Sequence, residues 1–156
     1  LRLQLRSFKA FGRAAQNHGV SGKKMAYLID TDIIINSIKG NQGVNQKIAE
    51  LASIPKAISI ITYGELLYGA KKSTQREKNT SVVYRLAEIF PIIGITRATM
   101  EAFTDLKAAL DRKGERIEDF DLLIAATALN LNYVLVTNNT KHYKRIEGLQ
   151  LENWLV

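Results

Sequence analysis

Carboxylates at three separate places in the chain are candidates for metal-dependent chemistry. The apolar residues of AYLI lead directly to Asp30, and Asp32 follows two positions later. An apolar run that ends in a carboxylate is typical of a buried strand that presents an acid at the edge of a sheet. Glu65 follows a second apolar run, and Asp121 precedes an alanine-rich one. Ligands of open parallel sheets bind beyond the carboxyl ends of the strands, so these acids would converge there if their strands are parallel neighbours.

A cluster of this kind indicates a divalent cation. Mg²⁺ and Mn²⁺ take oxygen ligands and keep several waters, so two to four carboxylates suffice to hold one ion. Two carboxylates about 4 Å apart repel by roughly 4 kcal/mol at an effective dielectric constant near 20, and the cluster therefore needs a cation or a proton. The chain has no cysteine, and its two histidines, His18 and His142, are too far apart in the sequence for a zinc motif.

Each acid also has a purely structural interpretation. Asp30 could cap the helix that follows it. The segment Thr62 to Glu65 fits a capping box, in which the glutamate folds back onto the backbone. Asp119 and Asp121 both suit the first turn of a helix, where the helix dipole favours carboxylates, and we expect Asp119 to be only a cap. Taken singly, none of these positions is specific.

Hydrophobic periodicity predicts an α/β domain with a central, mainly parallel sheet flanked by helices. The expected strands are the apolar run before Asp30 and the segments 57–61, 92–95, 133–137 and 149–151. The expected helices are 33–40, 44–54, 64–72 (opened by Thr62), 75–89, 98–113 and 122–132. The last of these helices is apolar nearly all round, so we expect it to lie buried against the sheet.

Composition bounds the class of protein. The chain has 156 residues, 46% of them hydrophobic and 24% charged, which is ordinary for one globular domain. No apolar run approaches the roughly 18 residues that a membrane-spanning helix needs. The lack of cysteine is typical of an intracellular setting, and we expect a cytoplasmic protein.

The net charge of +7 is concentrated at one end of the chain. Residues 1–24 carry six of the seven excess positive charges, and the remainder is close to neutral. Net charge therefore does not argue for nucleic-acid binding by the domain itself. We interpret residues 1–24 as a basic N-terminal extension and residues 25–156 as the domain; the alternatives are an arm that contacts nucleic acid or a partner chain, and a structural helix.

Four segments together resemble the motifs of small PIN-domain ribonucleases, namely YLIDTDIII, ITYGELLYGA, IEDFDLLIAATAL and YVLVTNNTKHYKRIEGL. They are similar in particular to VapC-type toxins of bacterial and archaeal toxin–antitoxin pairs, and the resemblance covers residues 25–156. It implies a PIN-like three-layer fold and an endoribonuclease that depends on Mg²⁺ or Mn²⁺. It also implies an antitoxin partner that covers the acidic pocket, and a homodimer.

The resemblance assigns roles to individual acids. Asp30 matches the first family acid, Glu65 the second and Asp121 the third. As a mechanism we expect Asp30 and Asp121 to hold Mg²⁺, while Glu65 ligates it or positions the water that attacks a phosphodiester. Asp32 and Asp119 are weaker candidates that would support these ligands.

The fourth family acid falls in the segment TNNTKHY, where this chain departs from the pattern. Asn139 and His142 stand where an aspartate or glutamate is often found. The number of bound ions, one or two, therefore stays open. Thr137 and Asn139 are candidates to support the metal ligands. We expect His142, beside Lys141 and Lys144, to be a surface residue.

Basic side chains outside the extension are possible phosphate contacts, because affinity for RNA comes largely from such charges. Most of them are expected to be solvated helix surface. They are Lys71, Lys72, Arg76, Lys78, Arg112, Lys113 and Arg116.

Three other readings compete with a nuclease. A phosphohydrolase of the haloacid-dehalogenase type also opens with Asp-x-Asp and uses a strand-end threonine such as Thr137. In that family the threonine precedes the last acidic motif, whereas here it follows Asp121. A response-regulator receiver domain needs an aspartate after a middle strand, which Ile61-Thr62 and Ile95-Thr96 do not supply. A catalytically degenerate PIN-fold binding module is the third alternative, because the fourth acid is missing.

Overall fold

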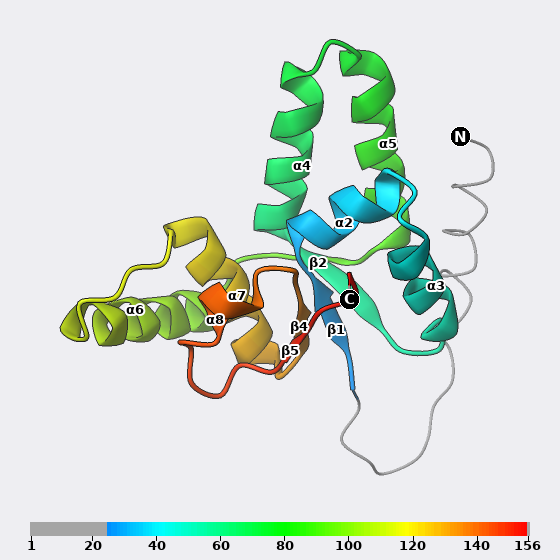
Figure 1. Cartoon of the computed structure of the whole chain (residues 1–156). Coiled ribbons are helices and arrows are strands. Elements are labelled where there is room, and N and C mark those ends of the chain that lie inside the picture. Colours follow the sequence, from blue (N-terminus) through cyan, green and yellow to red (C-terminus); the bar gives the residue numbers. More distant parts are fainter. Residues whose placement is uncertain (1–24, 156) are drawn as a thin grey trace.

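Five short parallel strands form the centre of the computed structural model, which describes residues 25–155 (Figure 1). Their order in the sheet is β3-β2-β1-β4-β5, and every neighbouring pair is parallel. The expected central, parallel sheet is therefore confirmed. The strands are β1 (Tyr27–Ile29), β2 (Lys56–Ser59), β3 (Ile92–Ile93), β4 (Val134–Val136) and β5 (Leu151–Glu152).

Helices cover both faces of this sheet, which gives the expected three layers (Figure 1). One face carries α2 (Thr31–Ile38), α3 (Gln42–Glu50), α4 (Ile60–Lys72) and α5 (Arg76–Ile89). The other face carries α6 (Arg97–Arg112), α7 (Asp119–Leu131) and α8 (Thr140–Tyr143). Helices α4 and α5 pack against each other as a hairpin that extends beyond the sheet (Figure 1).

The central strands are apolar on both faces because each face has its own core. In β1, Tyr27 and Ile29 pack into the core under α2 to α5, and Leu28 packs into the core under α6 to α8. In β4, Leu135 likewise faces the second core, while both of its neighbours face the first. Continuous apolar runs are typical of parallel strands that are covered on both sides. The alanine-rich helix α7 lies buried against this sheet, as expected.

The boundary between β2 and α4 differs from the expected one. The strand covers Lys56–Ser59 rather than 57–61, and the helix begins at Ile60. The reason is that Ser59 acts as the N-cap, with its Oγ accepting a hydrogen bond from the backbone N of Thr62 at 3.0 Å. The capping box that was expected between Thr62 and Glu65 is therefore wrong.

Other elements also differ from the expected ones. The third strand covers only Ile92–Ile93 rather than 92–95, α3 covers Gln42–Glu50 rather than 44–54, and the short helix α8 was not expected. Asn132 ends α7 as expected, with a left-handed backbone (φ 55°) that asparagine tolerates.

The division of the chain at residue 25 stays a prediction, because residues 1–24 lie outside the described residues. Within residues 25–155, no helix is both long and apolar enough to cross a membrane.

The contribution of the Ser59 cap to the stability of the fold should be measurable. We expect Ser59→Ala to lower the free energy of unfolding by about 1 kcal/mol, because the buried backbone N of Thr62 loses its acceptor. Urea unfolding measures this loss. The matched control is Ser81→Ala on α5, whose exposed hydroxyl only donates to the Glu77 carbonyl of its own helix, so a change within about 0.5 kcal/mol is expected. Equal losses in the two variants would contradict the assigned cap.

Candidate functional site

The first part of the site is built where β1 and β4 end side by side. Ile29 pairs with Val136 in the parallel register, so Asp30 and Thr137 follow at the same edge of the sheet. The Thr137 hydroxyl donates to Asp30 Oδ2 at 2.8 Å, and both residues are buried. Asp30 Oδ1 accepts from the backbone N of Thr31 at 2.8 Å, so the same carboxylate also caps α2. Capping α2 therefore does not prevent Asp30 from having a functional role as well.

Glu65 reaches the site from the second turn of α4. The Thr31 hydroxyl lies 2.8 Å from Glu65 Oε1 and 3.1 Å from the Thr62 hydroxyl, which links the start of α2 to α4. Sequence reasoning did not single out Thr31, although its place between Asp30 and Asp32 was a signal. The predicted convergence of the β1 end with Glu65 is therefore present.

Asp32 belongs to the same group of acids. Its Oδ2 accepts from the backbone N of Asn138 at 3.0 Å, and its Oδ1 accepts from the backbone N of Ile33 at 2.8 Å. Asn139, a supporting candidate, contributes its backbone N, which donates to the Thr137 hydroxyl at 3.0 Å. The residues that follow β4 thus bind both Asp30 and Asp32, through the Thr137 hydroxyl and the backbone N of Asn138.

Asp121 approaches from the first turn of α7 together with His142 of α8. His142 Nε2 lies 3.3 Å from Asp121 Oδ2, and only 24% of the His142 side chain is exposed. The expectation that His142 is a surface residue is wrong, because α8 turns this ring inward toward α7. The other ring nitrogen, Nδ1, lies 3.1 Å from the Arg145 guanidinium.

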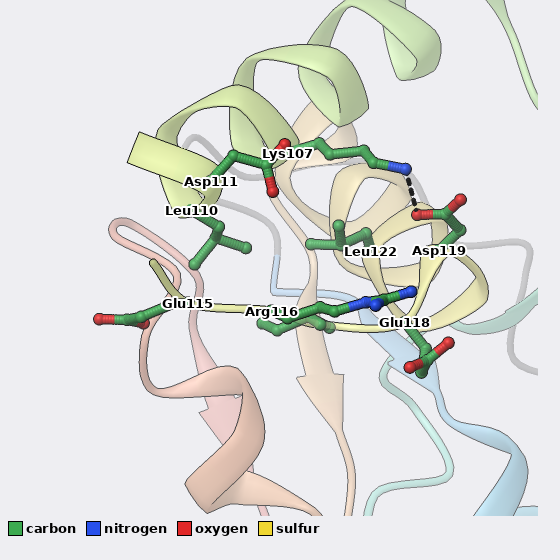
Figure 2. Close-up of a pocket in the computed structure, with 9 residues that line it drawn as sticks. Lys107, Leu110, Asp111, Glu115, Arg116, Glu118, Asp119 and Leu122 are labelled. Carbon is green, nitrogen blue, oxygen red and sulfur yellow. Dashed lines mark hydrogen bonds and ion pairs between the residues drawn. The ribbon is translucent and has the colours of Figure 1, made fainter. Parts of the chain in front are cut away.

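Asp119 points away from this group. Its Oδ1 lies 2.7 Å from Lys107 Nζ on α6, and Glu118 rather than Asp119 is the N-cap of α7. Figure 2 shows this ion pair beside a cavity of about 280 Å³ between α6 and α7, which Arg116 also lines. Asp119 is therefore an ion-paired surface residue rather than a cap.

The basic side chains that were proposed as phosphate contacts are all exposed, which suits either solvated surface or contact with RNA. Four lie on the α4–α5 hairpin and three lie at or after the end of α6; they are Lys71, Lys72, Arg76, Lys78, Arg112, Lys113 and Arg116.

Burial and the charges of neighbouring acids raise the pKa values of three carboxylates in this group. Burial raises the pKa of Asp30 to about 7, with further contributions from Asp32 and Asp121, while the hydrogen bonds from Thr137 and Thr31 work in the opposite direction. Burial and the Asp121 charge raise the pKa of Asp32. The pKa of Glu65 is raised by burial and by Asp121 and Asp32, partly offset by the Thr31 hydrogen bond. Four carboxylates from three helices and a strand end therefore share one electrostatic environment.

Tyr143 is a member of the site that sequence reasoning missed. Its side chain is 1% exposed, and its pKa is raised by burial and by the charges of Asp30, Asp121, Asp32 and Glu65. The hydroxyl therefore lies within the field of all four acids. Its only sequence signal was its place beside His142 in the segment after β4.

The donor set consists of oxygens, but it is not preassembled. Within residues 25–155, no three histidine, aspartate or glutamate side chains are arranged as a formed metal site. Asp30 and Glu65 are instead turned toward threonine hydroxyls. A carboxylate can accept about four hydrogen bonds or ligands, so Asp30, which accepts two, keeps capacity for a cation.

Comparison with known proteins gives a consistent result. Residues 27–149 match the family described as "PIN domain". The chain is 37% identical over 132 residues to ribonuclease VapC2 of Rickettsia felis, covering 83% of this chain and 98% of the relative. It is 31% identical over 130 residues to the tRNA(fMet)-specific endonuclease VapC of Shigella flexneri, covering 83% of this chain and 98% of that relative.

Solved structures of similar chains agree with the fold. The crystal structure of VapBC2 from Rickettsia felis bound to a promoter DNA fragment matches with a TM-score of 0.79 at 36% identity, covering 83% of this chain and 99% of that one. The structure of VapBC-1 from nontypeable Haemophilus influenzae matches with a TM-score of 0.77 at 33% identity, covering 85% of this chain and 100% of that one.

The raised pKa of Asp30 predicts how stability depends on pH. An acid whose pKa rises on folding binds more protons in the folded state, so stability falls as pH rises through the window between the two values. For Asp30 this window runs from 3.8 to about 7. We expect Asp30→Asn to become progressively more stable than the parent chain across this window without divalent ions, by at most about 4 kcal/mol at about 1.4 kcal/mol per pKa unit.

Chemical denaturation at several pH values in the presence of a chelator measures this difference. Asp119→Asn is the control, because its carboxylate is paired with Lys107 at the surface, and its difference from the parent should stay constant. A constant difference for Asp30→Asn as well would show that Asp30 ionises normally.

Proposed function

Because the chain belongs to the PIN-domain family and, within it, to the VapC ribonucleases, we propose that it is a divalent-metal-dependent endoribonuclease and the toxin of a toxin–antitoxin pair. The observation that carries this proposal is the gathering of Asp30, Asp32, Glu65 and Asp121 into one partly buried, mutually repelling group. Such a group is unfavourable on its own and becomes favourable when a cation joins it.

The chemistry of the donor set fits a hard cation such as Mg²⁺, with Mn²⁺ as an alternative. Carboxylate oxygens are the ligands that both ions prefer. Asp30 and Asp121 would hold the ion, and Glu65 would either ligate it or position the attacking water. A bound ion of this kind lowers the pKa of water and stabilises the charge that develops on a phosphodiester.

The remaining residues of the site have positioning roles in this proposal. Thr137 fixes the Asp30 carboxylate, and the backbone N of Asn138 fixes Asp32. The Thr31 hydroxyl holds Glu65 at the opposite side of the group. Thr137 directly follows β4 and Thr31 begins α2, while Asn138 belongs to the short turn between β4 and α8, so all three donors are positioned by the ends of regular elements.

The partners follow from the family. Several of the similar solved structures are described as VapBC, and those from Rickettsia felis and Salmonella typhimurium are described as DNA-bound. We propose that this chain binds a cognate antitoxin, acts on RNA as a homodimer and works in the cytoplasm. The haloacid-dehalogenase and receiver-domain readings lose their support, since the family match covers residues 27–149.

Substitution of the metal-holding acids tests the activity. We expect Asp30→Asn and Asp121→Asn each to lower RNA cleavage by roughly two orders of magnitude or more, because each removes a charge that stabilises the transition state through the ion. Cleavage is measured on labelled single-stranded RNA and on total RNA with sequencing of the new 5′ ends. Asp119→Asn, which leaves the acidic group intact, should cleave like the parent chain.

Full magnesium-dependent cleavage by both variants would exclude the assigned ligands. Unchanged cleavage by the parent chain in a chelator would exclude the metal. Specific binding of the antitoxin without any RNA cleavage would favour the degenerate binding module.

Metal binding should also be visible as stabilisation. A ligand that binds only the folded state at 100 times its Kd adds about 2.7 kcal/mol to the free energy of unfolding. We expect Mg²⁺ or Mn²⁺ to raise the Tm of the parent chain at pH 7.5 by an amount that saturates with concentration, and to leave the Tm of Asp30→Asn unchanged. Matched additions of NaCl control for screening, and equal increases in both proteins would contradict a site at Asp30.

A further inference from the structure

Two adjacent polar atoms on α8 are buried without a hydrogen bond. They are Nε2 of His142 and the hydroxyl oxygen of Tyr143, which belong to a short set of such atoms within residues 25–155. Buried donors without a partner are rare in folded proteins, and each needs an explanation. Nε2 of His142 lies beside Asp121, and the Tyr143 hydroxyl lies within the electrostatic field of all four acids, which suggests that the explanation is functional.

The contacts of His142 fix which ring nitrogen carries the proton. Arg145 Nη2 lies 3.1 Å from His142 Nδ1, and a guanidinium can only donate. Nδ1 is therefore the acceptor, and Nε2 carries the proton of the neutral ring. Arg145 is held in turn by the backbone carbonyls of Arg116 and His142, at 3.0 and 3.2 Å. The Nε2 donor is thus aimed at Asp121 Oδ2, 3.3 Å away, but the pair does not have the geometry of a formed hydrogen bond.

Tyr143 brings a second neutral donor to the same acids. Its ring is packed in the core under α6 to α8 and meets the His142 ring edge-on, with 5.6 Å between the ring centroids. Burial and the charges of the acids hold the pKa of Tyr143 far above its ordinary value, so the hydroxyl keeps its proton. Tyr143 and His142 therefore form one rigid, uncharged pair of donors beside Asp30 and Asp121.

We propose that His142 and Tyr143 are positioning residues, whose two neutral donors on α8 hold the Asp121 and Asp30 carboxylates in place for the divalent ion. This inference rests on the proposed function. A lysine or arginine in this place would neutralise the acids and compete with the ion. An uncharged N–H or O–H orients a carboxylate and leaves its negative charge for the cation, and partners of metal ligands act in this way.

The test measures Mn²⁺ affinity by titration calorimetry on the full chain. We expect Tyr143→Phe and His142→Phe each to weaken Mn²⁺ binding roughly tenfold, the effect of losing a partner of a metal ligand. His142→Gln should bind like the parent chain, because its side-chain amide presents a donor at the place of Nε2. The control Tyr133→Phe should also bind normally, since Tyr133 packs against the same core but directly precedes β4, at the end of that strand opposite Thr137.

Thermal unfolding without metal separates positioning from folding. The Tyr143 hydroxyl makes no hydrogen bond within residues 25–155, so Tyr143→Phe should melt at the same temperature as the parent chain or higher. Weaker Mn²⁺ binding combined with unchanged melting supports the proposal. A clearly lower Tm would show that the hydroxyl has a structural partner, and would overturn it.

The outcomes also separate this inference from the proposed function. If the parent chain binds Mn²⁺, Asp30→Asn does not, and both phenylalanine variants bind normally, the metal site stands and the role of α8 is overturned. If His142→Gln is as weak as His142→Phe, the donor role of His142 is overturned. If the parent chain and Asp30→Asn give the same Mn²⁺ titration, the proposed function fails and this inference fails with it.

Discussion

The burial of like charges at one edge of the sheet is the constraint on which the rest of the site depends. Burial raises the pKa values of Asp30, Asp32 and Glu65, and the charges of neighbouring acids, Asp121 among them, raise these pKa values further. Two carboxylates about 4 Å apart repel by roughly 4 kcal/mol at an effective dielectric constant near 20. The hydrogen bonds from Thr137, Thr31 and the backbone N of Asn138 hold these carboxylates in place.

The architecture holds these charges together by fixing the backbone that carries them. The residues before Asp30 and Thr137 are among the most buried in the chain; Leu28, Ile29, Leu135 and Val136 are all 0% exposed. A fully buried aliphatic side chain contributes roughly 1.5–3 kcal/mol, so moving the strand ends apart would cost more than the repulsion that it relieves. Because the charges cannot separate, they are relieved only by a proton or by a cation.

The sequence predicted the parts of this arrangement that depend on local pattern. An apolar run that ends in an acid predicted β1 and Asp30, and the alanine-rich segment predicted a buried helix behind Asp121. The capping box at Glu65 failed, because Ser59 competes for the same backbone N and places the N-cap three residues earlier. The contacts of the segment after β4 with distant elements were not visible in the sequence. His142 and Tyr143 lie on a four-residue helix whose orientation depends on packing against α7 and β5.

The replacement of a fourth acid by neutral donors bears on how many ions the site can hold. A further carboxylate beside Asp121 would add another repulsion to a group in which Asp30 already has a pKa near 7. His142 and Tyr143 instead bring donors without charge to the same place. Two divalent ions close together repel each other strongly and need enough negative charge between them. Under the proposed function, uncharged residues in that position therefore favour one bound ion over two.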